Sequence, residues 1–267
     1  HLYGQMADVG AVQALAARHG LAVVEDAAQA QGATRDGHGI GHGSAAAATS
    51  FYPGKNLGAY GDAGAVVTDD AGVADAVRLL GNHGSRHKYV HESIGFNSRL
   101  DTLQAVVLRA KLTRLEDWNE RRRAAADRYT QALLGTAVQC LQVDPANLAV
   151  WHLYVVRVEA AARDQVLAAL AAARIGAGIH YPTPVHLHPA FAGLGHGPGA
   201  FPVAEQAAAR MLSLPLHPTL TAAEQNRVVS TVLSALAPAP QPVLQPARAR
   251  DQLVPATRAT TAQRPGS

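Results

Sequence analysis

The sequence is poor in cysteine and in charged residues, and it has no long apolar run. Of its 267 residues, 16% are charged and a single one, Cys140, is a cysteine. One cysteine excludes an intramolecular disulfide framework and is typical of the reducing cytoplasm, where we expect the protein. A membrane helix needs about 20 consecutive apolar residues, and their absence predicts no membrane span. Residues 1–5 also lack the basic and apolar regions of a secretory signal.

The distribution of charge does not favour binding to nucleic acid. The net charge is +3, and the excess lies after Pro238, where four arginines face a single acidic residue, Asp251. Proteins that bind nucleic acid concentrate basic residues on a folded face, whereas residues 238–267 are rich in Pro, Ala, Gln and Thr. We therefore predict a disordered tail and no nucleic-acid partner. The alternative is an accessory contact with nucleic acid through this tail.

Short apolar runs alternate with helical patterns over the first half of the chain. This alternation predicts an α/β fold with a mainly parallel sheet covered by helices. The apolar run at residues 21–25 is typical of a strand buried on both faces. Asp69 and Asp70 are both suited to cap the helix that follows them. The predicted strands are residues 21–25, 45–50 and 63–68, and the predicted helices are residues 9–19 and 70–80.

The second half predicts a smaller α/β domain that is reached through a long helix. Residues 101–134 contain no Gly or Pro, and one helix of that length spans about 50 Å, enough to leave one domain and enter another. Later strands are predicted at 150–158 and 178–181, and helices at 163–174 and 222–236. We thus expect a partial large domain at 1–115, a smaller C-terminal domain at 116–237 and the tail.

Three polar stretches follow predicted strands, where α/β sheets gather ligands. They are residues 25–30, residues 50–64 and residues 95–101. Within the second stretch, Gly54-Lys55 suggests a phosphate-binding P-loop, but that motif requires glycine at position 49 and Ser or Thr at position 56. The sequence has Thr49 and Asn56, which excludes a P-loop ATPase.

The residue types in these stretches suit pyridoxal-5′-phosphate (PLP) instead. A lysine that binds PLP covalently needs a short loop, a nearby phosphate ligand and a lowered pKa. Lys55 lies on a glycine-rich loop, and the Ser50 hydroxyl precedes it by five residues. Asp26, at a neighbouring strand end, is suited to pair with the pyridine nitrogen, which makes the ring an electron sink. Alone, such a lysine is usually solvated and such an aspartate usually caps a helix, so their order and spacing carry the prediction.

These motifs resemble those of the DegT/DnrJ/EryC1/StrS sugar aminotransferases. The similarity covers residues 1 to about 236 and is concentrated in residues 1–5, 25–30, 50–64, 95–100, 178–182 and 213–218. The resemblance implies the aspartate-aminotransferase fold (fold type I), a homodimer, and transfer of an amino group from glutamate to a nucleotide-linked keto-deoxy sugar. The form of residues 53–58 looks more like members that act on 3-keto sugars than like those that act on 4-keto sugars.

The resemblance also implies which residues contact the cofactor. Lys55 resembles the lysine that binds PLP and moves protons; relatives with His there deoxygenate sugars, so Lys55 favours transamination. The other implied contacts are Asp26 to the pyridine nitrogen, Ala28 against the ring, Gln29 to the phenolic oxygen, Ser50 to the phosphate, and Asn97 to the phosphate of the other subunit.

Contacts with the sugar nucleotide are implied in the same way. The matching positions are Tyr52, Lys88 (in trans), His180 and Tyr181. The alternatives are that Tyr52 packs in the core and that Lys88 is a surface charge. We expect no metal, because the alternating His186 and His188 have no Cys, Asp or Glu cluster that completes a ligand shell.

The resemblance finally implies an N-terminal portion before the segment that matches residues 1–4, with further strands and a phosphate-binding turn. Nothing in the sequence replaces those parts, so we expect an N-terminally truncated chain. Two alternatives to an active aminotransferase stay open. One is a catalytically inert fragment, and the other is a non-enzymatic interaction or regulatory protein.

Overall fold

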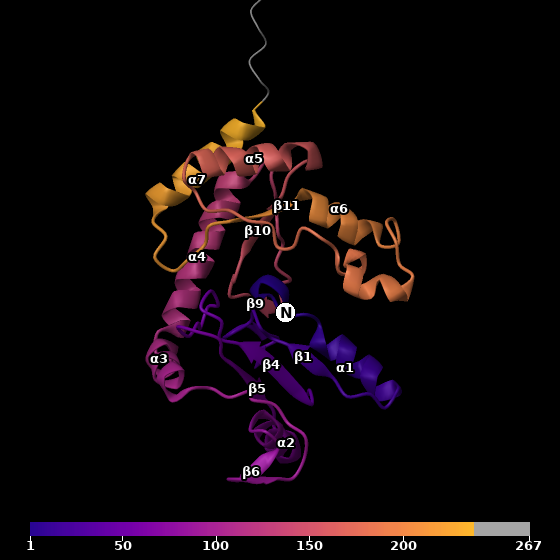
Figure 1. Ribbon diagram of the computed structural model, residues 1–267. Coiled ribbons are helices and arrows are strands. Elements are labelled where there is room, and N and C mark those ends of the chain that lie inside the picture. The colour runs from indigo at the N-terminus through magenta and orange to yellow at the C-terminus, as the bar shows by residue number, and fades with distance from the viewer. Residues whose placement is uncertain (238–267) are drawn as a thin grey trace, which may run out of the picture. The chain divides into compact units, whose positions relative to one another are not determined.

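The sheet in the first half of the chain has three strands in the order β1-β4-β5. In the computed structural model, which describes residues 1–237, these strands are β1 (Val24–Asp26), β4 (Ala46–Ser50) and β5 (Gly64–Val67) (Figure 1). β1 and β4 pair in parallel, whereas β5 pairs antiparallel to β4. The α/β class is confirmed, and the predicted parallel pairing is present between β1 and β4. The antiparallel direction of β5 was not predicted.

Strand β1 differs from its prediction in bounds and in burial. The prediction of a strand at residues 21–25 that is buried on both faces is wrong. β1 is Val24–Asp26, and Leu21 and Val24 are 65% and 68% exposed. Within residues 1–237, β1 pairs with β4 alone, so no neighbouring strand covers its other edge. Sequence hydrophobicity indicates a tendency to be buried, but the neighbouring elements determine whether burial occurs.

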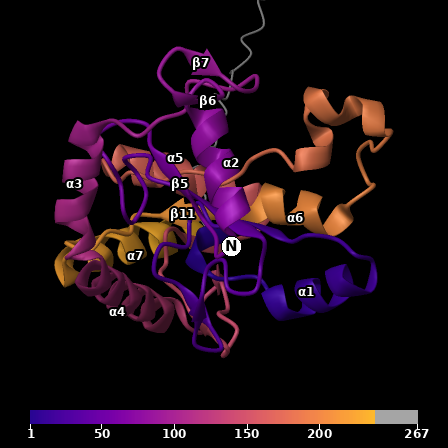
Figure 2. The same ribbon diagram turned by 90° about the horizontal axis from the view of Figure 1, so that it is seen from below.

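Two helices in this half are capped at their N-terminus by an aspartate side chain. In α1 (Val9–Arg18), the carboxylate of Asp8 accepts a hydrogen bond from the backbone of Ala11. In α2 (Ala71–Gly81), Asp70 accepts from Gly72 and Val73 at 2.7 and 3.1 Å. Asp70 is thus the cap among the two candidates, because its side chain satisfies backbone donors of the first turn. Figure 2 shows α1 and α3 (Thr102–Leu112) on opposite sides of α2.

The predicted single helix at residues 101–134 is wrong. Two helices replace it, α3 and α4 (Leu115–Leu133). At the break, the Thr113 hydroxyl and the Arg114 backbone N–H both donate to carbonyls three residues earlier, at 2.9 Å. These bonds replace the i to i−4 pattern of an α-helix, and two acidic residues in the first turn of α4 favour a new helix start there. Neither signal involves Gly or Pro, which is why the sequence pattern did not reveal the break.

The second half of the described chain is built on the antiparallel sheet β11-β10-β8. Its strands are β8 (Gln139–Cys140), β10 (Tyr154–Arg157) and β11 (Met211–Leu214), and its helices are α5 (Ala160–Ala172), α6 (Pro202–Arg210) and α7 (Ala222–Leu236). Figure 1 shows α5 and α7 side by side. The core of this half is a cluster of buried apolar residues that includes Tyr129, Leu133, Tyr154, Val156, Leu170, Leu212 and Val232.

Two predictions for this half need correction, and two further elements were not predicted. The strand predicted at 150–158 is only β10, because the backbone of Val150 and His152 bonds instead to Gly4 and Tyr3, and Trp151 has a φ of 46°. The strand predicted at 178–181 is a single bridge between Gly178 and Ser213. Helix α6 and strand β11 were not predicted. Two short 3-10 segments, η2 (Val185–Leu187) and η3 (Pro189–Leu194), precede α6.

Short strands and turns connect the two halves. η1 (Leu2–Gly4) lies at the start of the chain. A second antiparallel sheet joins β2 (Thr34–Arg35), β3 (His38–Gly39) and β9 (Asn147–Leu148), and a hairpin joins β6 (Ser85–His87) to β7 (Val90–His91). Because β2 pairs with β9, residues more than 100 positions apart in the sequence are held together.

The division into two domains stays a prediction. Residues 1–237 form one compact unit. Within it, Met6, Ala30, Ala33 and Val150 form one small core, Leu57, Ala59 and Leu108 form another, and the large cluster described above begins within α4. The predicted disordered tail lies outside the described residues. Between residues 1 and 237, no helix is long and apolar enough to cross a membrane.

Candidate active site

Lys55 lies on the loop that follows β4, and its side chain is half-buried. Its backbone N–H donates to the carbonyl of Tyr52 at 2.8 Å. Within residues 1–237, its ammonium group makes no hydrogen bond or ion pair. Burial lowers the pKa of Lys55, while the nearby carboxylate of Asp26 opposes this effect more weakly. An amine with a lowered pKa and no protein partner is suited to react with a carbonyl compound.

The loop that carries Lys55 is closed at both ends. The Ala59 N–H donates to the carbonyl of Phe51 at 2.7 Å, and Lys111 on α3 donates to the carbonyl of Gly58 at 2.6 Å. A Cβ at Gly58 would clash with the carbonyl of Pro53. The loop is therefore compact because residue 58 is glycine, and the backbone of Lys55 is held between two anchored ends.

Asp26 and Ser50 are the last residues of β1 and β4. Because these strands are parallel neighbours, both side chains lie at the same edge of the sheet, at the base of the lysine loop. The exposed Asp26 carboxylate accepts a hydrogen bond from the N–H of Ala28 at 3.0 Å, and Ala28 is half-buried. The Ser50 Oγ accepts from the N–H of Tyr52 at 3.2 Å, which leaves its own hydrogen available to an anionic ligand.

Gln29 is buried, and the orientation of its amide is set by its neighbour. Its Oε1 accepts a hydrogen bond from the backbone N–H of Tyr3 at 2.5 Å. Since a backbone N–H only donates, Oε1 must face Tyr3. The Nε2 group has no hydrogen-bond partner within residues 1–237, so it is available to donate to a ligand oxygen.

Tyr3 was not among the predicted site residues, yet it links three of the segments around the site. Besides its bond to Gln29, its carbonyl accepts from the N–H of His152 at 2.9 Å and its hydroxyl donates to the carbonyl of His180 at 2.5 Å. Tyr3 has a φ of 62°, which is unusual for a side chain of this size. Gly4 follows it at a φ of 92°, where a Cβ would lie 2.9 Å from the backbone nitrogens of residues 151 and 152. The sequence signal was the Tyr-Gly pair, but its partners are distant in sequence.

His180 and Tyr181 lie together at the end of the segment that follows α5. Nδ1 of His180 is 2.8 Å from the hydroxyl of Ser213, and partial burial lowers the pKa of His180. The Tyr181 ring meets the His180 ring edge-on, at 5.5 Å between centroids, and its side chain is exposed. Tyr52, beside Lys55, is exposed as well, so it does not pack in the core.

Asn97 and Lys88 are not brought to Lys55 in the single chain. Both are exposed. Asn97 pairs with Asn82 in an isolated bridge, and the ammonium group of Lys88 lies 4.9 Å above the ring of Tyr89. Within the described part of the chain, no hydrogen bond or ion pair joins either residue to the lysine loop. Their predicted roles, which require a second subunit, stay predictions.

His152 is a second residue near Lys55 that the sequence interpretation missed. Its Nδ1 lies 3.2 Å from Oδ1 of Asn56. Burial lowers the pKa of His152 to about 3, and the positive charges of Lys55, Arg122 and His180 act in the same direction. The imidazole is therefore uncharged at neutral pH. It was missed because residues 150–158 were interpreted as a continuous strand.

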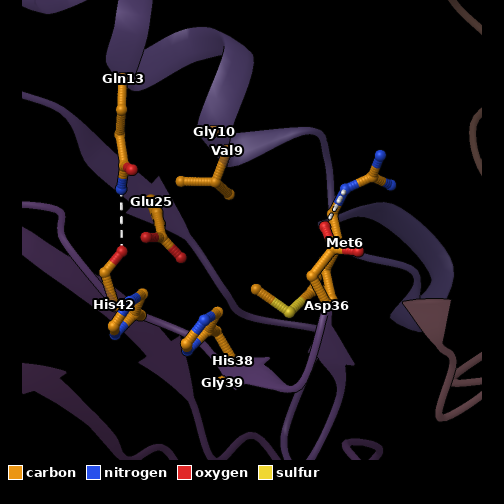
Figure 3. Close-up of a pocket in the computed structure, with 10 residues that line it drawn as sticks. Met6, Val9, Gly10, Gln13, Glu25, Asp36, His38, Gly39 and His42 are labelled. Carbon is orange, nitrogen blue, oxygen red and sulfur yellow. Dashed lines mark hydrogen bonds and ion pairs between the residues drawn. The ribbon is translucent and has the colours of Figure 1, made fainter. Parts of the chain in front are cut away.

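A separate small pocket lies beside α1. Figure 3 shows the carboxylate of Glu25 in it, between Gln13 and the rings of His38 and His42. Oε2 of Glu25 bonds to His1 and Gly41 at 2.8 and 3.0 Å, whereas Oε1 is buried and has no hydrogen-bond partner in the described part of the chain. None of the predicted site residues lines this pocket, so we treat the edge of β1 and β4 as the candidate active site.

Comparisons with known proteins agree with the residue patterns. The chain is 53% identical over 233 residues to the erythromycin biosynthesis sensory transduction protein EryC1 of Saccharopolyspora erythraea, a match that covers 87% of this chain and 63% of that protein. It is 50% identical over 237 residues to a dTDP-3-amino-3,4,6-trideoxy-alpha-D-glucose transaminase of Streptomyces venezuelae, covering 87% and 61%. The chain thus spans about three fifths of the length of these curated relatives.

A solved structure shows the same fold. The crystal structure of DesV from S. venezuelae, in complex with a ketimine intermediate, matches with a TM-score of 0.84 and 50% sequence identity; the match covers 88% of this chain and 63% of that one. Residues 1–233 match the profile of one family, which is described as the DegT/DnrJ/EryC1/StrS aminotransferase family. The chain belongs to the DegT/DnrJ/EryC1/StrS aminotransferase family.

Proposed function

We propose that the protein is a PLP-dependent aminotransferase that transfers an amino group from glutamate to a nucleotide-linked keto-deoxy sugar with its keto group at carbon 3. The observation that carries this proposal is the state of Lys55, a half-buried amine that has no hydrogen-bond or ion-pair partner among residues 1–237. Burial lowers its pKa, and it lies near Asp26 at the shared edge of β1 and β4. The similar S. venezuelae protein is named for a 3-amino sugar, which supports the position of the keto group.

The residues at this edge fit PLP. Gln29 offers an Nε2 donor for the phenolic oxygen, and the Ser50 hydroxyl offers a donor for the phosphate. The Asp26 carboxylate is suited to accept a hydrogen bond from the protonated pyridine nitrogen, and the small, half-buried side chain of Ala28 would lie against the ring. When bound, PLP supplies an aldehyde that exchanges amino groups and a ring that withdraws electrons from the reacting carbon.

Lys55 has two tasks in the proposed reaction. In its neutral form, which the lowered pKa favours, Nζ would hold the cofactor. As a free amine, Nζ would remove the proton from the α-carbon of the amino donor and, in the second half-reaction, deliver a proton to the sugar carbon that receives the amine. His180, Tyr181 and Tyr52 are proposed to contact the sugar nucleotide, since His180 is tied to Gln29 through Tyr3.

We also propose a homodimer in which Asn97 and Lys88 act on the site of the partner subunit. The support is a run of exposed apolar side chains around them, where Ile94 is 94% exposed and Phe96 is 68% exposed. The other members of this run are Tyr89, Val90, Leu103 and Val106. Apolar side chains gathered at an exposed segment mark protein interfaces. The cytoplasmic location and the two-domain division stay predictions.

An amino-transfer assay tests the proposal. Purified protein is incubated with PLP, glutamate and a dTDP-linked 3-keto-6-deoxy sugar, and the amino sugar and 2-oxoglutarate are measured by mass spectrometry. We expect both products with the natural sequence and neither with Lys55→Arg, which keeps the positive charge but cannot bind PLP covalently. Equal product with Lys55→Arg contradicts the mechanism, and turnover of the 4-keto isomer alone contradicts the substrate.

The alternative of a regulatory or inert protein is favoured by one observation. The similar S. erythraea protein is named as a sensory transduction protein, and this chain spans about three fifths of its relatives. Binding of PLP at Lys55 without any release of 2-oxoglutarate from glutamate would support this alternative over the aminotransferase.

A further inference from the structure

Asn56, the residue next to Lys55, forms hydrogen bonds with both polar atoms of its side chain. The side chain of Asn56 is buried, with 5% of its area exposed. Its Nδ2 donates to Oδ1 of Asn119 and to the carbonyl of Val150, both at 2.9 Å. Its Oδ1 lies 3.2 Å from Nδ1 of His152. The amide has two hydrogens and both are used, so a flipped amide would place its oxygen against two acceptors. The orientation of Asn56 is therefore fixed.

Asn119 on α4 continues this hydrogen-bonded chain. It is 3% exposed, and its Nδ2 donates to the backbone carbonyl of Gln31 at 2.9 Å. Gly32 leaves the space for this amide, since a Cβ there would lie 2.7 Å from Nδ2 of Asn119, and its φ is 87°. The backbone of residues 31 and 32 is thus shaped around the side chain of Asn119.

Gln31 ends the chain at the two loops that carry the candidate cofactor residues. Its side chain is 5% exposed, and its Nε2 lies 3.1 Å from the carbonyl of Ala28 and 2.7 Å from the carbonyl of Ser50. It also lies 3.0 Å from the hydroxyl of Thr49, which in turn donates to the carbonyl of Ala27 at 3.1 Å. The ends of β1 and β4 are therefore bonded to each other and, through Gln31 and Asn119, to Asn56.

The same chain determines the tautomer of His152. Because both hydrogens of the Asn56 amide are used, its Oδ1 faces the imidazole and accepts from an Nδ1–H of His152. The charged or titratable groups that act on this imidazole are Lys55, Arg122 and His180. One guanidinium nitrogen of Arg122 donates to the carbonyls of Trp151 and Leu216, at 3.3 and 3.0 Å. No carboxylate lies within ion-pair distance of His152 in the described residues, so the imidazole beside Lys55 is neutral.

We propose that Asn56 and His152 are positioning residues for Lys55: through Asn119 and Gln31, they fix the lysine loop against the loops of Asp26 and Ser50. The proposal rests on the proposed function of Lys55. It assigns no contact with substrate or cofactor to these residues. The loop is held by hydrogen bonds of side-chain amides, in which the nitrogen donates and the oxygen accepts. Substitutions that keep the shape of the side chain but exchange a donor for an acceptor therefore test the proposal.

The first test measures the amine of Lys55 without any cofactor. The chain has three lysines, Lys55, Lys88 and Lys111, so acetylation with acetic anhydride across pH, followed by peptide mass spectrometry, reads Lys55 directly and the other two as internal references. Asn56→Asp replaces a donor by an acceptor beside Lys55 and adds a negative charge. Both looser burial and this charge favour the ammonium form. We therefore expect the labelling midpoint of Lys55, the pH at which its acetylation rate is half of the maximum, to rise by about one pH unit or more. Asn226→Asp on the exposed face of α7 is the matched control, with no shift expected.

A pair of His152 variants separates positioning from stability. His152→Asn keeps a donor at the place of Nδ1 and is expected to retain the natural labelling midpoint of Lys55. His152→Gln places its amide further out and loses that donor, so it is expected to raise the midpoint in the same direction as Asn56→Asp. Thermal unfolding of each variant reports stability separately, and this pair carries the test if Asn56→Asp does not fold.

The outcomes distinguish this proposal from the proposed function. A raised midpoint in Asn56→Asp and His152→Gln, with natural midpoints in His152→Asn and Asn226→Asp, supports positioning. Natural midpoints in all four variants overturn it, even where thermal stability falls, because the residues would then be merely structural. If the natural protein carries no PLP on Lys55 after incubation with PLP and reduction with borohydride, the proposed function is contradicted, whatever the acetylation of Lys55 shows.

Discussion

The backbone N–H of Tyr3 donates a hydrogen bond to Oε1 of Gln29 at 2.5 Å. Since the carbonyl of the same Tyr3 accepts from His152 and its hydroxyl donates to His180, a short segment at the start of the chain organises three sides of the candidate site. Gln29 is held with its amide nitrogen unbonded by any residue from 1 to 237, which is the orientation that a cofactor oxygen requires.

Gln29→Glu tests this orientation. The carboxylate still accepts from Tyr3, but its second oxygen cannot donate to the phenolic oxygen of PLP and repels it. Because a carboxylate at this buried position is costly, we expect the free energy of unfolding to fall. In the folded variant we expect the dissociation constant for PLP to rise at least about tenfold, which corresponds to about 1.4 kcal/mol. Absorbance titration with PLP measures it. An unchanged dissociation constant would show that Gln29 does not contact the cofactor.

Tyr3→Phe removes one hydroxyl and leaves the carbonyl of His180 without its donor. The expected cost is about 1–2 kcal/mol of unfolding free energy, as for the loss of a half-buried hydrogen bond. Tyr60→Phe is the matched control, because the Tyr60 side chain is exposed and lies outside the proposed dimer interface, and it is expected to stay within about 0.5 kcal/mol of the natural protein. Urea unfolding at pH 7 measures both, and equal values for the two variants would contradict the role given to Tyr3.

Acid stability tests the neutral state of His152. Its folded pKa, about 3, lies below its ordinary value of 6.5, so the unfolded chain binds the proton first and stability falls as pH falls below 6.5. Between pH 7 and pH 5 the loss assigned to this residue is up to about 2 kcal/mol. His152→Asn, which cannot titrate, is expected to lose less stability than the natural protein by that amount. If both proteins lose the same free energy of unfolding between pH 7 and pH 5, His152 becomes protonated in the folded protein as readily as in the unfolded chain, which contradicts the lowered pKa.

Gly32→Ala and Gly37→Ala separate steric contact from backbone strain. Both glycines have positive φ, 87° and 80°. Among the residues that the structure describes, a Cβ at Gly32 would lie 2.7 Å from the amide of Asn119, whereas a Cβ at Gly37 would meet nothing within 4 Å. Gly37→Ala is expected to cost about 1 kcal/mol through its backbone alone. Gly32→Ala is expected to cost about 1–3 kcal/mol more, because it displaces a buried side chain. Chemical unfolding measures the difference, and equal costs would mean that Asn119 moves freely.

Ile94→Asp tests the proposed dimer interface. A charge in the middle of an apolar contact is costly to bury, so we expect the variant to be monomeric at concentrations where the natural protein is a dimer. Val203→Asp is the control, since Val203 is exposed on α6, away from the run around Asn97. Light scattering during size-exclusion chromatography gives the mass. A natural protein that is already monomeric, or two variants with equal mass, would contradict the interface.

The parts of the structure that follow from local patterns were predictable. The strand that ends at Ser50, the helix cap at Asp70 and the loop of Lys55 follow from a short apolar run, a capping side chain and a motif, whereas the bounds and burial of β1 did not follow from its apolar run. The pairing of β1 with β4 then brings Asp26 and Ser50 to one edge. The proximity of Lys55 to Asp26 follows from the same arrangement.

The parts that depend on distant contacts were not predictable in this way. Tyr3 and His152 become site neighbours because their backbones pair across the fold, and no property of either residue reveals that pairing. The break between α3 and α4 involves neither Gly nor Pro, but a pair of bonds at Thr113 and Arg114. Exposure of Val24 depends on which strand is its neighbour, which hydrophobicity alone does not indicate.

The proposed function depends on covalent binding of PLP by Lys55. The most direct measurement is peptide mapping by mass spectrometry after the protein has been incubated with PLP and reduced with borohydride. We predict the mass of reduced PLP on the peptide that contains Lys55 and its absence from the peptides of Lys88 and Lys111. Reduced PLP spread equally over the three lysines, or absent from Lys55, would contradict the claim.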